Sequence, residues 1–204
     1  KIDIVFLSEV NFECAVCPVN QVEYLARKTK MHCFVFGENY SWGLPFFRIR
    51  SGNAILSKFP LHPLKTEQLA GGKPFYNPTN NRRIVWAELT LNKHKYLCAS
   101  LRNDSFSVSE NLVHAKQILK KLGTKTALLG GDFNADSNTE AIRLFEKSGL
   151  FQAEFHGPAT YPTNKPSRCI DFIMAPKTWK LLDHKIILSN LSDHLPVVSV
   201  FEIP

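Results

Sequence analysis

The chain has 204 residues, of which 44% are hydrophobic and 21% charged, a composition typical of globular rather than disordered or fibrous proteins. A chain of this length can form its own core without disulfides or a metal, and it predicts a single domain over residues 1–204. No apolar run approaches the ~20 residues that cross a bilayer, so we expect no transmembrane segment. The first apolar run, 4–7, is too short for a secretory signal.

The formal net charge of the chain is +7, from 25 Lys and Arg against 18 Asp and Glu. This excess favours an anionic partner, such as nucleic acid, a phospholipid head group or a phosphorylated small molecule. Cys14 and Cys17 form a single C-x-x-C motif, which predicts a local disulfide or two ordinary thiols rather than a closed zinc site. The cysteines leave the compartment unknown, with a cytoplasmic location favoured over a periplasmic or secreted one. We expect the chain to be a soluble monomer.

Short apolar runs alternate with helical patterns along the chain, as in α/β and α+β proteins. The first half predicts strands at 3–9, 32–36 and 53–58, a helix at 20–30, and a long aromatic-rich loop at 37–51. It continues with a loop rich in Gly, Pro and Asn at 69–81 and a hairpin of 84–91 with 96–101.

The second half of the chain predicts two helices and four strands. One helix is capped by Ser107 or Ser109 and runs to Leu122 on an apolar stripe. The other elements are a helix from about 138 to 147 and strands at 126–131, 169–175, 186–188 and 197–203.

Acidic residues stand where several of these apolar strands end. Asp132 and Asn134 are two residues apart, so in an extended chain their side chains share a face. Asp171 lies within the run IDFI, where a carboxylate needs a partner or a cation. The other residues in this pattern are Glu9, Asp193 and His194. Several carboxylates with one histidine favour Mg²⁺ or Mn²⁺, which prefer oxygen ligands, over zinc.

Each of these residues alone has an ordinary structural explanation. Asp132 could cap the following helix, Asp193 could cap a turn, and Glu9 could be a solvated surface residue. Their occurrence together, in this order along the chain, is what indicates a functional site.

Sequence blocks in this order resemble the endonuclease/exonuclease/phosphatase family. The blocks are DIVFLSEV at 3–10, SGNAILSKFP at 51–60, GDFN at 131–134, TYP at 160–162 with RCIDFI at 168–173, and SDH at 192–194. The resemblance implies an α/β (α+β) four-layer sandwich, in which two mixed sheets pack together between outer helices. The family also has a strand before the first block, and we expect this chain to lack it.

The resemblance assigns roles to the matching residues. Glu9 and Asp193 would bind the catalytic metal, Mg²⁺ or Mn²⁺. Asp132 would orient or deprotonate the attacking water, and Asn134 would steady the phosphate or Asp132.

The same resemblance pairs a histidine with an acid. His194 would contact the scissile phosphate, and Asp171 would hold its tautomer and favour its charged form. The metal would offset the charge of the phosphate, while the imidazolium stabilises developing negative charge.

Three residues are candidates for substrate binding: Asn53, Arg82 and Ser100. Arg82 could grip a phosphate through its guanidinium, or simply end a solvated loop. Ser100 stands where most relatives have a histidine. In deoxyribonuclease-like relatives that histidine pairs with a glutamate near the Gly-Asn-Ala block, and the nearest residue in this chain is Ser51. Both changes indicate altered leaving-group chemistry or a weakened enzyme.

We therefore expect a hydrolase of phosphate esters that depends on Mg²⁺ or Mn²⁺, chiefly a phosphodiesterase or nuclease-like enzyme. Its substrate would be nucleic acid, a phospholipid head group or a small phosphodiester. One alternative is a catalytically weakened family member that binds phosphate ligands or a protein. The other is a lipid or inositol phosphoesterase that meets a membrane surface through the apolar segment 40–47.

Overall fold

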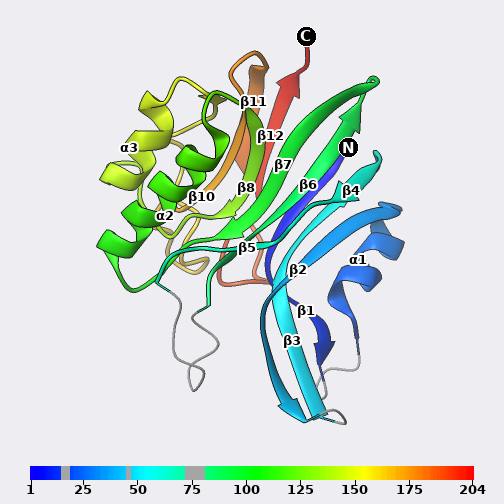
Figure 1. Ribbon diagram of the computed structural model, residues 1–204. Coiled ribbons are helices and arrows are strands. Elements are labelled where there is room, and N and C mark those ends of the chain that lie inside the picture. The colour runs from blue at the N-terminus through cyan, green and yellow to red at the C-terminus, as the bar shows by residue number, and fades with distance from the viewer. Residues whose placement is uncertain (15–18, 45–46, 72–80) are drawn as a thin grey trace. The chain divides into compact units, whose positions relative to one another are not determined.

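The computed structural model describes residues 1–14, 19–44, 47–71 and 81–204, which form 12 strands and three helices (Figure 1). The α+β class expected from the sequence is confirmed. Cys17, most of the predicted loop at 69–81 and part of the segment 40–47 lie outside the described residues. Among the described residues, every helix is too short or too polar to cross a membrane.

The chain divides into two compact units, Lys1–Arg102 and Asn103–Pro204. The organisation as a single domain stays a prediction.

The first unit contains two groups of strands that pack against each other. β1 (Ile4–Cys14), β3 (Phe47–Ser57) and β2 (Cys33–Leu44) form an antiparallel sheet in that order. The predicted hairpin is β6 (Arg83–Leu91) with β7 (His94–Arg102), and the short strands β4 (Leu61–Pro63) and β5 (Glu67–Gln68) pair with β6.

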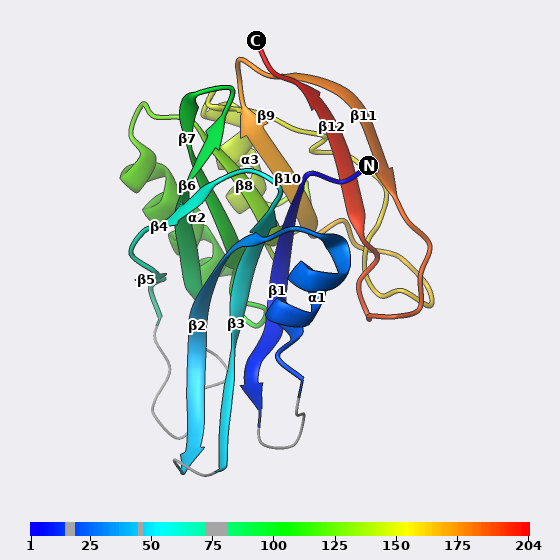
Figure 2. The ribbon, with the colours of Figure 1, turned by 90° about the vertical axis from the view of Figure 1, so that its right-hand side faces the viewer.

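Helix α1 (Gln21–Thr29) lies against the sheet of β1, β3 and β2 (Figure 2). The Asn20 side chain accepts a hydrogen bond from the Glu23 backbone and so satisfies one free N–H of the first turn. Val22 and Ala26, one helical turn apart, are buried in a core cluster that includes Leu56 of β3. The predicted helix at 20–30 is therefore correct.

The segment 37–51 was expected to be a loop, and this prediction is wrong: apart from 45–46, which lie outside the described residues, it belongs to the paired strands β2 and β3. Next to this segment, a Cβ at Gly52 would lie 2.0 Å from the carbonyl oxygen of Gly37. Gly52 is thus required by the close approach of two strands, a use of glycine that composition does not distinguish from a loop.

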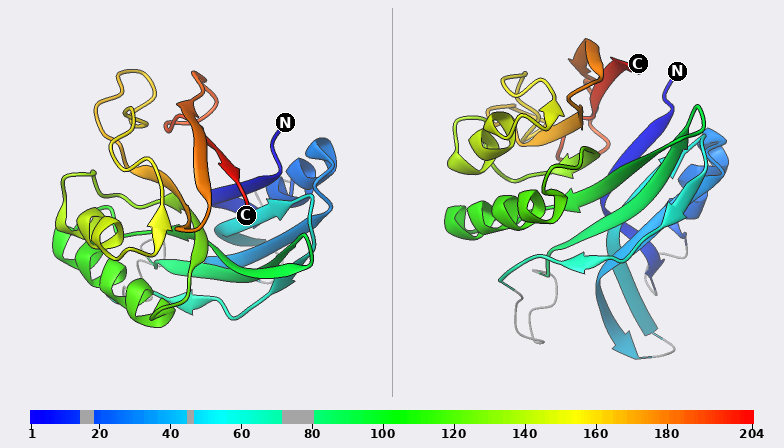
Figure 3. Two further views of the ribbon diagram at one scale, coloured as in Figure 1. Left: turned by 90° about the horizontal axis from the view of Figure 1, so that it is seen from above. Right: turned by 45° about the horizontal axis from the view of Figure 1, so that its top comes forward.

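In the second unit, the helices α2 (Val108–Leu122) and α3 (Glu140–Lys147) lie side by side (Figure 3). Of the two predicted caps of α2, Ser107 is the one observed, and its hydroxyl accepts from the Glu110 N–H. The strands of this unit are β8 (Ala127–Asp132), β9 (Phe151–Gln152), β10 (Asp171–Pro176), β11 (Lys180–Ile186) and β12 (Val197–Glu202).

Strand β10 pairs antiparallel with β8 and β9, and β11 pairs with β12. The sequence placed a strand at 186–188, whereas β11 ends at Ile186. The prediction relied on an apolar run, but β11 is a partly exposed strand with Asp183, His184 and Lys185 in its middle. Such a strand has no continuous apolar run to detect.

An aromatic cluster fixes the end of β8. Phe133 is fully buried and meets Phe145 of α3 and Phe172 of β10 edge-on, with ring centroids 5.5 and 5.6 Å apart. Because successive side chains of an extended chain point in opposite directions, the core position of Phe133 turns its neighbours Asp132 and Asn134 away from this cluster.

Candidate functional site

Asp132 and Asn134 form one hydrogen-bonded unit at the end of β8. The Asp132 carboxylate accepts from the Asn134 backbone N–H at 2.8 Å and from the Asn134 side-chain amide at 2.9 Å. The same amide donates to the Asn103 carbonyl at 3.1 Å. Asn134 has a φ of 50°, a left-handed conformation that costs energy in a residue other than glycine. These bonds hold it there, as expected for a preorganised site.

Asp171 and His194 meet beside Asp132. The register of β8 and β10 places Asp171 directly opposite Asp132. His194 Nδ1 lies 2.8 Å from Asp171 Oδ2, and the Thr160 hydroxyl donates to that same oxygen at 2.6 Å. The other ring nitrogen of His194, Nε2, lies 4.0 Å from Asp132 Oδ2. Asp171 therefore fixes the tautomer and orientation of a histidine whose free nitrogen faces Asp132.

The surroundings of His194 favour its protonated form. Burial by itself lowers the pKa of His194, but the hydrogen bond to Asp171 and the charges of Asp171, Asp132 and Asp193 outweigh it. The net effect raises the pKa above its usual 6.5. A cationic imidazole at this position is suited to contact a phosphate.

The same three side chains could hold a metal ion. Ligand atoms of Asp132, Asp171 and His194 all lie within 4.8 Å of one another, and this is the one such group among the described residues. Because His194 Nδ1 is already hydrogen-bonded to Asp171, the ring nitrogen left to bind a metal is Nε2, next to the Asp132 carboxylate. Two carboxylates and one imidazole fit Mn²⁺, and fit Mg²⁺ through their oxygens.

Glu9 lies in the first unit at an irregularity of β1. The register between β1 and β3 shifts between Leu7 and Val10, and Glu9 has a φ of 55°. Its carboxylate, 51% exposed, forms an ion pair with Arg102, and Arg82 Nη1 lies 3.8 Å from the same oxygen. Bulges often turn a side chain out of the regular strand pattern, and here the bulge carries an accessible carboxylate between two guanidinium groups.

The chain matches the model of the Endonuclease/Exonuclease/phosphatase family over residues 1–194. The chain belongs to this family. Members of the family act on phosphate esters and include phosphoesterases and nucleases. The match extends over both units of the chain.

Several solved structures share the fold of the chain. A functionally unknown conserved protein from Enterococcus faecalis V583 is 21% identical, with a TM-score of 0.68 over 98% of this chain and 85% of that one. An endonuclease/exonuclease/phosphatase from Beutenbergia cavernae DSM 12333 is 16% identical, with a TM-score of 0.76 over 98% of this chain and 62% of that one. The mannosyl-6-phosphatase Bt3783 of Bacteroides thetaiotaomicron VPI-5482 is 14% identical, with a TM-score of 0.64 over 98% and 85%.

These identities establish the fold alone. No curated protein sequence matches the chain.

Asn53, Arg82 and Ser100, the three predicted substrate contacts, are all buried in the first unit of this family member. Asn53 donates to the Arg83 carbonyl at 2.9 Å. The Ser100 hydroxyl donates to the Leu7 carbonyl at 3.1 Å, so at the position of the family histidine this chain ties β7 to β1. Contact of any of the three with substrate stays a prediction.

Asp193 lies outside the cluster of Asp132, Asp171 and His194. It is exposed, its carboxylate accepts from the Ser192 hydroxyl at 3.3 Å, and its charge helps to raise the pKa of His194. Its role as a metal ligand, like that of Glu9, stays a prediction.

The sequence assigned no role to two residues that lie beside the candidate groups. Thr160 donates to Asp171 from 11 residues away, and no spacing rule marks such a hydroxyl. Arg102 ends β7 and pairs with Glu9. The rule that pointed to acids at strand ends, applied also to basic residues, would have found Arg102.

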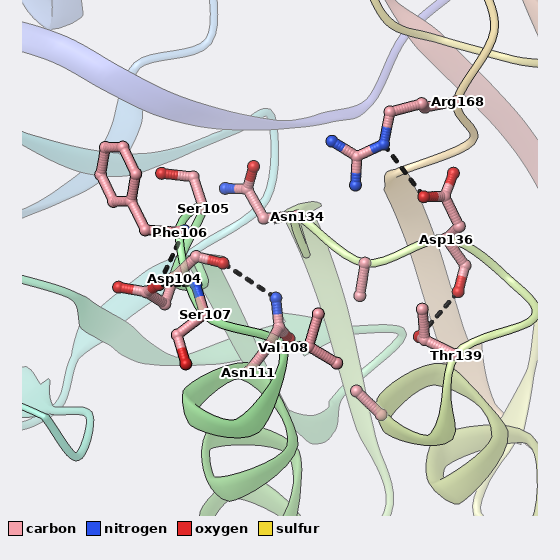
Figure 4. Close-up of a pocket in the computed structure, with 12 residues that line it drawn as sticks. Asp104, Ser105, Phe106, Ser107, Val108, Asn111, Asn134, Asp136, Thr139 and Arg168 are labelled. Carbon is pink, nitrogen blue, oxygen red and sulfur yellow. Dashed lines mark hydrogen bonds and ion pairs between the residues drawn. The ribbon is translucent and has the colours of Figure 1, made fainter.

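A pocket adjoins Asn134 in the second unit (Figure 4). Its walls come from the loop before α2, the first turns of α2 and α3, the segment after β8, and Arg168. The Arg168 side chain reaches Asp136, with Nε 3.0 Å from the carboxylate.

Proposed function

We propose that the chain is a hydrolase of phosphate esters that depends on Mg²⁺ or Mn²⁺, with phosphodiesters as its main substrates. The observation that carries this proposal is the convergence of Asp132, Asp171 and His194, in which one histidine is oriented by one carboxylate and faces another. Family membership supports the reaction class, and the net charge of +7 supports an anionic substrate.

Asp132 is the group that activates water. Asn134 binds the Asp132 carboxylate through both its backbone and its side chain, so the carboxylate is held ready without reorganisation. It accepts a proton from the water that attacks phosphorus, a contribution typically of about 10²–10⁴ in rate.

His194 stabilises the negative charge that develops on the phosphate. Its Nδ1 donates to Asp171, which leaves Nε2 to donate to a phosphate oxygen. The raised pKa of His194 keeps this donor charged over more of the neutral pH range.

Glu9 and Asp193 are the proposed ligands of the catalytic metal, because Asp132, Asp171 and His194 are assigned to water activation and phosphate contact. A divalent ion held there would neutralise phosphate charge and position the attacking water. Arg82, beside Glu9, is the proposed phosphate contact on the first unit.

A second candidate is a family member that binds phosphate ligands and does not turn them over. It is favoured by Ser100, whose hydroxyl is engaged with Leu7 where relatives carry a histidine, and by the ion pair of Glu9 with Arg102.

Hydrolysis of bis-p-nitrophenyl phosphate with EDTA, Mg²⁺ or Mn²⁺ separates the two candidates. We expect turnover that requires metal and falls at least about 100-fold in Asp132→Asn. Asp183→Asn, the same change at an exposed position of β11, serves as the control and should leave turnover intact. Equal turnover by wild type and Asp132→Asn would refute the assignment, and anion binding with no turnover would favour the binding protein.

A further inference from the structure

The pocket beside Asn134 has a volume of about 150 Å³. Sites for whole drug-sized ligands are typically about 300–1,000 Å³, so this pocket suits one ring-sized part of a substrate. Asn134 lines the pocket and also donates to Asp132. A group in the pocket would therefore lie next to the proposed reaction centre, within the same unit.

A buried polar network holds one wall of the pocket in place. Asp104, 2% exposed, accepts from the backbone N–H groups of Phe106 and Ser107 at 2.8 and 2.7 Å. Asn111, 3% exposed, donates to the carbonyls of Asp104 and Phe133 at 3.0 and 2.8 Å. Buried hydrogen-bond networks of this kind rigidify the backbone they hold. The loop is therefore preorganised.

This rigid loop presents an aromatic ring to solvent at the rim of the pocket. Phe106 is 74% exposed, and its neighbour Val108 is 77% exposed. Both line the pocket (Figure 4). A fixed and exposed apolar surface at a pocket rim is suited to pack against the apolar face of a ligand.

The opposite wall offers both hydrogen-bond donors and hydrogen-bond acceptors. Arg168 Nε bonds Asp136 Oδ2 at 3.0 Å, and Figure 4 shows the two terminal nitrogens of Arg168 directed away from that bond, on the side of Asn134. The charged side chains of the lining are Asp104, Asp136 and Arg168, two negative and one positive. This balance disfavours a second phosphate and favours an uncharged group with hydroxyls.

We propose that this pocket binds the alcohol part of the phosphate ester and selects a polyhydroxylated, sugar-like group. Hydroxyls of that group bond the Arg168 guanidinium and the Asp136 carboxylate, while its C–H face packs on Phe106. The inference rests on the proposed function, because it places the phosphorus of the same molecule beside Asp132 and His194.

Binding of matched ligands tests the pocket apart from catalysis. The probes are glucose 6-phosphate, ribose 5-phosphate and glycerol 3-phosphate, with methyl phosphate and phenyl phosphate, which carry no hydroxyls on the alcohol part, as comparisons. Isothermal titration of the full chain carrying Asp132→Asn avoids turnover. We expect at least one polyol phosphate to bind about tenfold or more tightly than methyl phosphate and phenyl phosphate.

Arg168→Gln should abolish that preference and leave the affinity for methyl phosphate unchanged. Arg143→Gln, the same change on the exposed face of α3, should alter neither affinity. Phe106→Ala removes a side chain that is mostly exposed, so it should keep the fold while weakening polyol binding about threefold or more.

Equal binding of all probes, tighter binding of phenyl phosphate, or an unaltered preference in Arg168→Gln would each overturn the proposal. Hydrolysis of bis-p-nitrophenyl phosphate by the wild type is measured in parallel. If hydrolysis is absent but the polyol preference depends on Arg168, the pocket stands and the proposed enzyme does not. If hydrolysis is present without that preference, only the pocket is refuted.

Discussion

Asp132 and Asp171 lie opposite each other in the antiparallel register of β8 and β10, so two carboxylates stand on neighbouring strands. His194 lies close to both, with Nδ1 2.8 Å from Asp171 Oδ2 and Nε2 4.0 Å from Asp132 Oδ2. Two like charges at such a place destabilise each other unless a cation is shared between them. Protonated His194 or a bound metal can supply that cation. The pH dependence of the protein and its metal affinity therefore report on the same group of side chains.

His194 and His184 should make opposite contributions to stability as pH changes. The folded pKa of His194 lies above the usual 6.5, so its contribution is complete below pH 6.5 and is lost as pH rises through the folded pKa. Burial lowers the pKa of His184, so its contribution holds above pH 6.5 and is lost as pH falls through the folded pKa.

Urea unfolding of the wild type, His194→Gln and His184→Gln across the range from pH 5 to pH 9 measures both contributions. The difference between wild type and His194→Gln should shrink at the alkaline end, and that between wild type and His184→Gln at the acid end. The same pH trend in both differences would contradict these assignments.

Thr160→Val tests whether the hydroxyl positions the dyad. Thr160 is 1% exposed, and its hydroxyl donates to the oxygen of Asp171 that also holds His194. Without this donor the Asp171 carboxylate is a stronger partner for the imidazolium, so the pKa of His194 should rise further. We also expect a stability loss of roughly 1–3 kcal/mol.

The ring signals of His194 in an NMR titration give its pKa directly. Thr29→Val is the control, since that hydroxyl donates to the Leu25 carbonyl at 2.7 Å within α1. An unchanged His194 titration in Thr160→Val would limit Thr160 to a packing role.

Phe145→Ala should destabilise the protein by about 3–5 kcal/mol, because Phe145 is fully buried against Phe133 in the cluster that fixes the end of β8. Phe106→Ala, at an exposed position, should change stability by no more than about 0.5 kcal/mol. Thermal or urea unfolding of the two variants compares them directly. Equal losses in both would show that the aromatic cluster does not anchor β8.

Arg102→Gln should increase the affinity of the chain for Mn²⁺ if Glu9 is a metal ligand. The guanidinium of Arg102 pairs with the Glu9 carboxylate and competes with a metal for it. We expect Kd to fall about tenfold, which corresponds to about 1.4 kcal/mol. Glu9→Gln should weaken binding instead, measured for both variants by titration calorimetry.

Arg83→Gln is the control for the loss of one positive charge nearby, since Arg83 bonds the Glu38 carbonyl at 2.9 Å. Equal Kd values in the wild type, Arg102→Gln and Glu9→Gln would remove Glu9 from the metal site.

Local patterns were predictable from the sequence where one element contains the whole signal. The cap at Asn20 and the stripe through Val22 and Ala26 define α1 without help from the rest of the chain. The pairing of Asp132 with Asn134 likewise depends on residues close along the chain, although Asn134 takes a left-handed conformation and not the extended one expected. Two of the family blocks also identified Asp171 and His194 as site residues, and in the structure Asp171 Oδ2 lies 2.8 Å from His194 Nδ1.

Features that depend on tertiary contact were missed. Gly52 is a strand residue because another backbone passes close to it, and nothing in its neighbours along the chain says so. Thr160 and Arg102 acquire their partners only on folding. Ser100 was noticed as a departure from the family, but its bond to Leu7 became visible only when β1 and β7 were placed side by side.

The loop between Tyr161 and Arg168 is closed at its base by backbone bonds in both directions, since Tyr161 N–H donates to the Arg168 carbonyl and Arg168 N–H donates back. Thr160, on one side of this base, supports the dyad, while Arg168, on the other side, reaches the pocket. Thr163 also belongs to the fixed part, because its N–H and hydroxyl donate to the Asp193 and Ser192 carbonyls. Residues 164–167 can therefore be exchanged or lengthened without moving either anchor, as surface loops tolerate insertion. A library randomised at 164–167 would search for new specificities while both anchors stay in place.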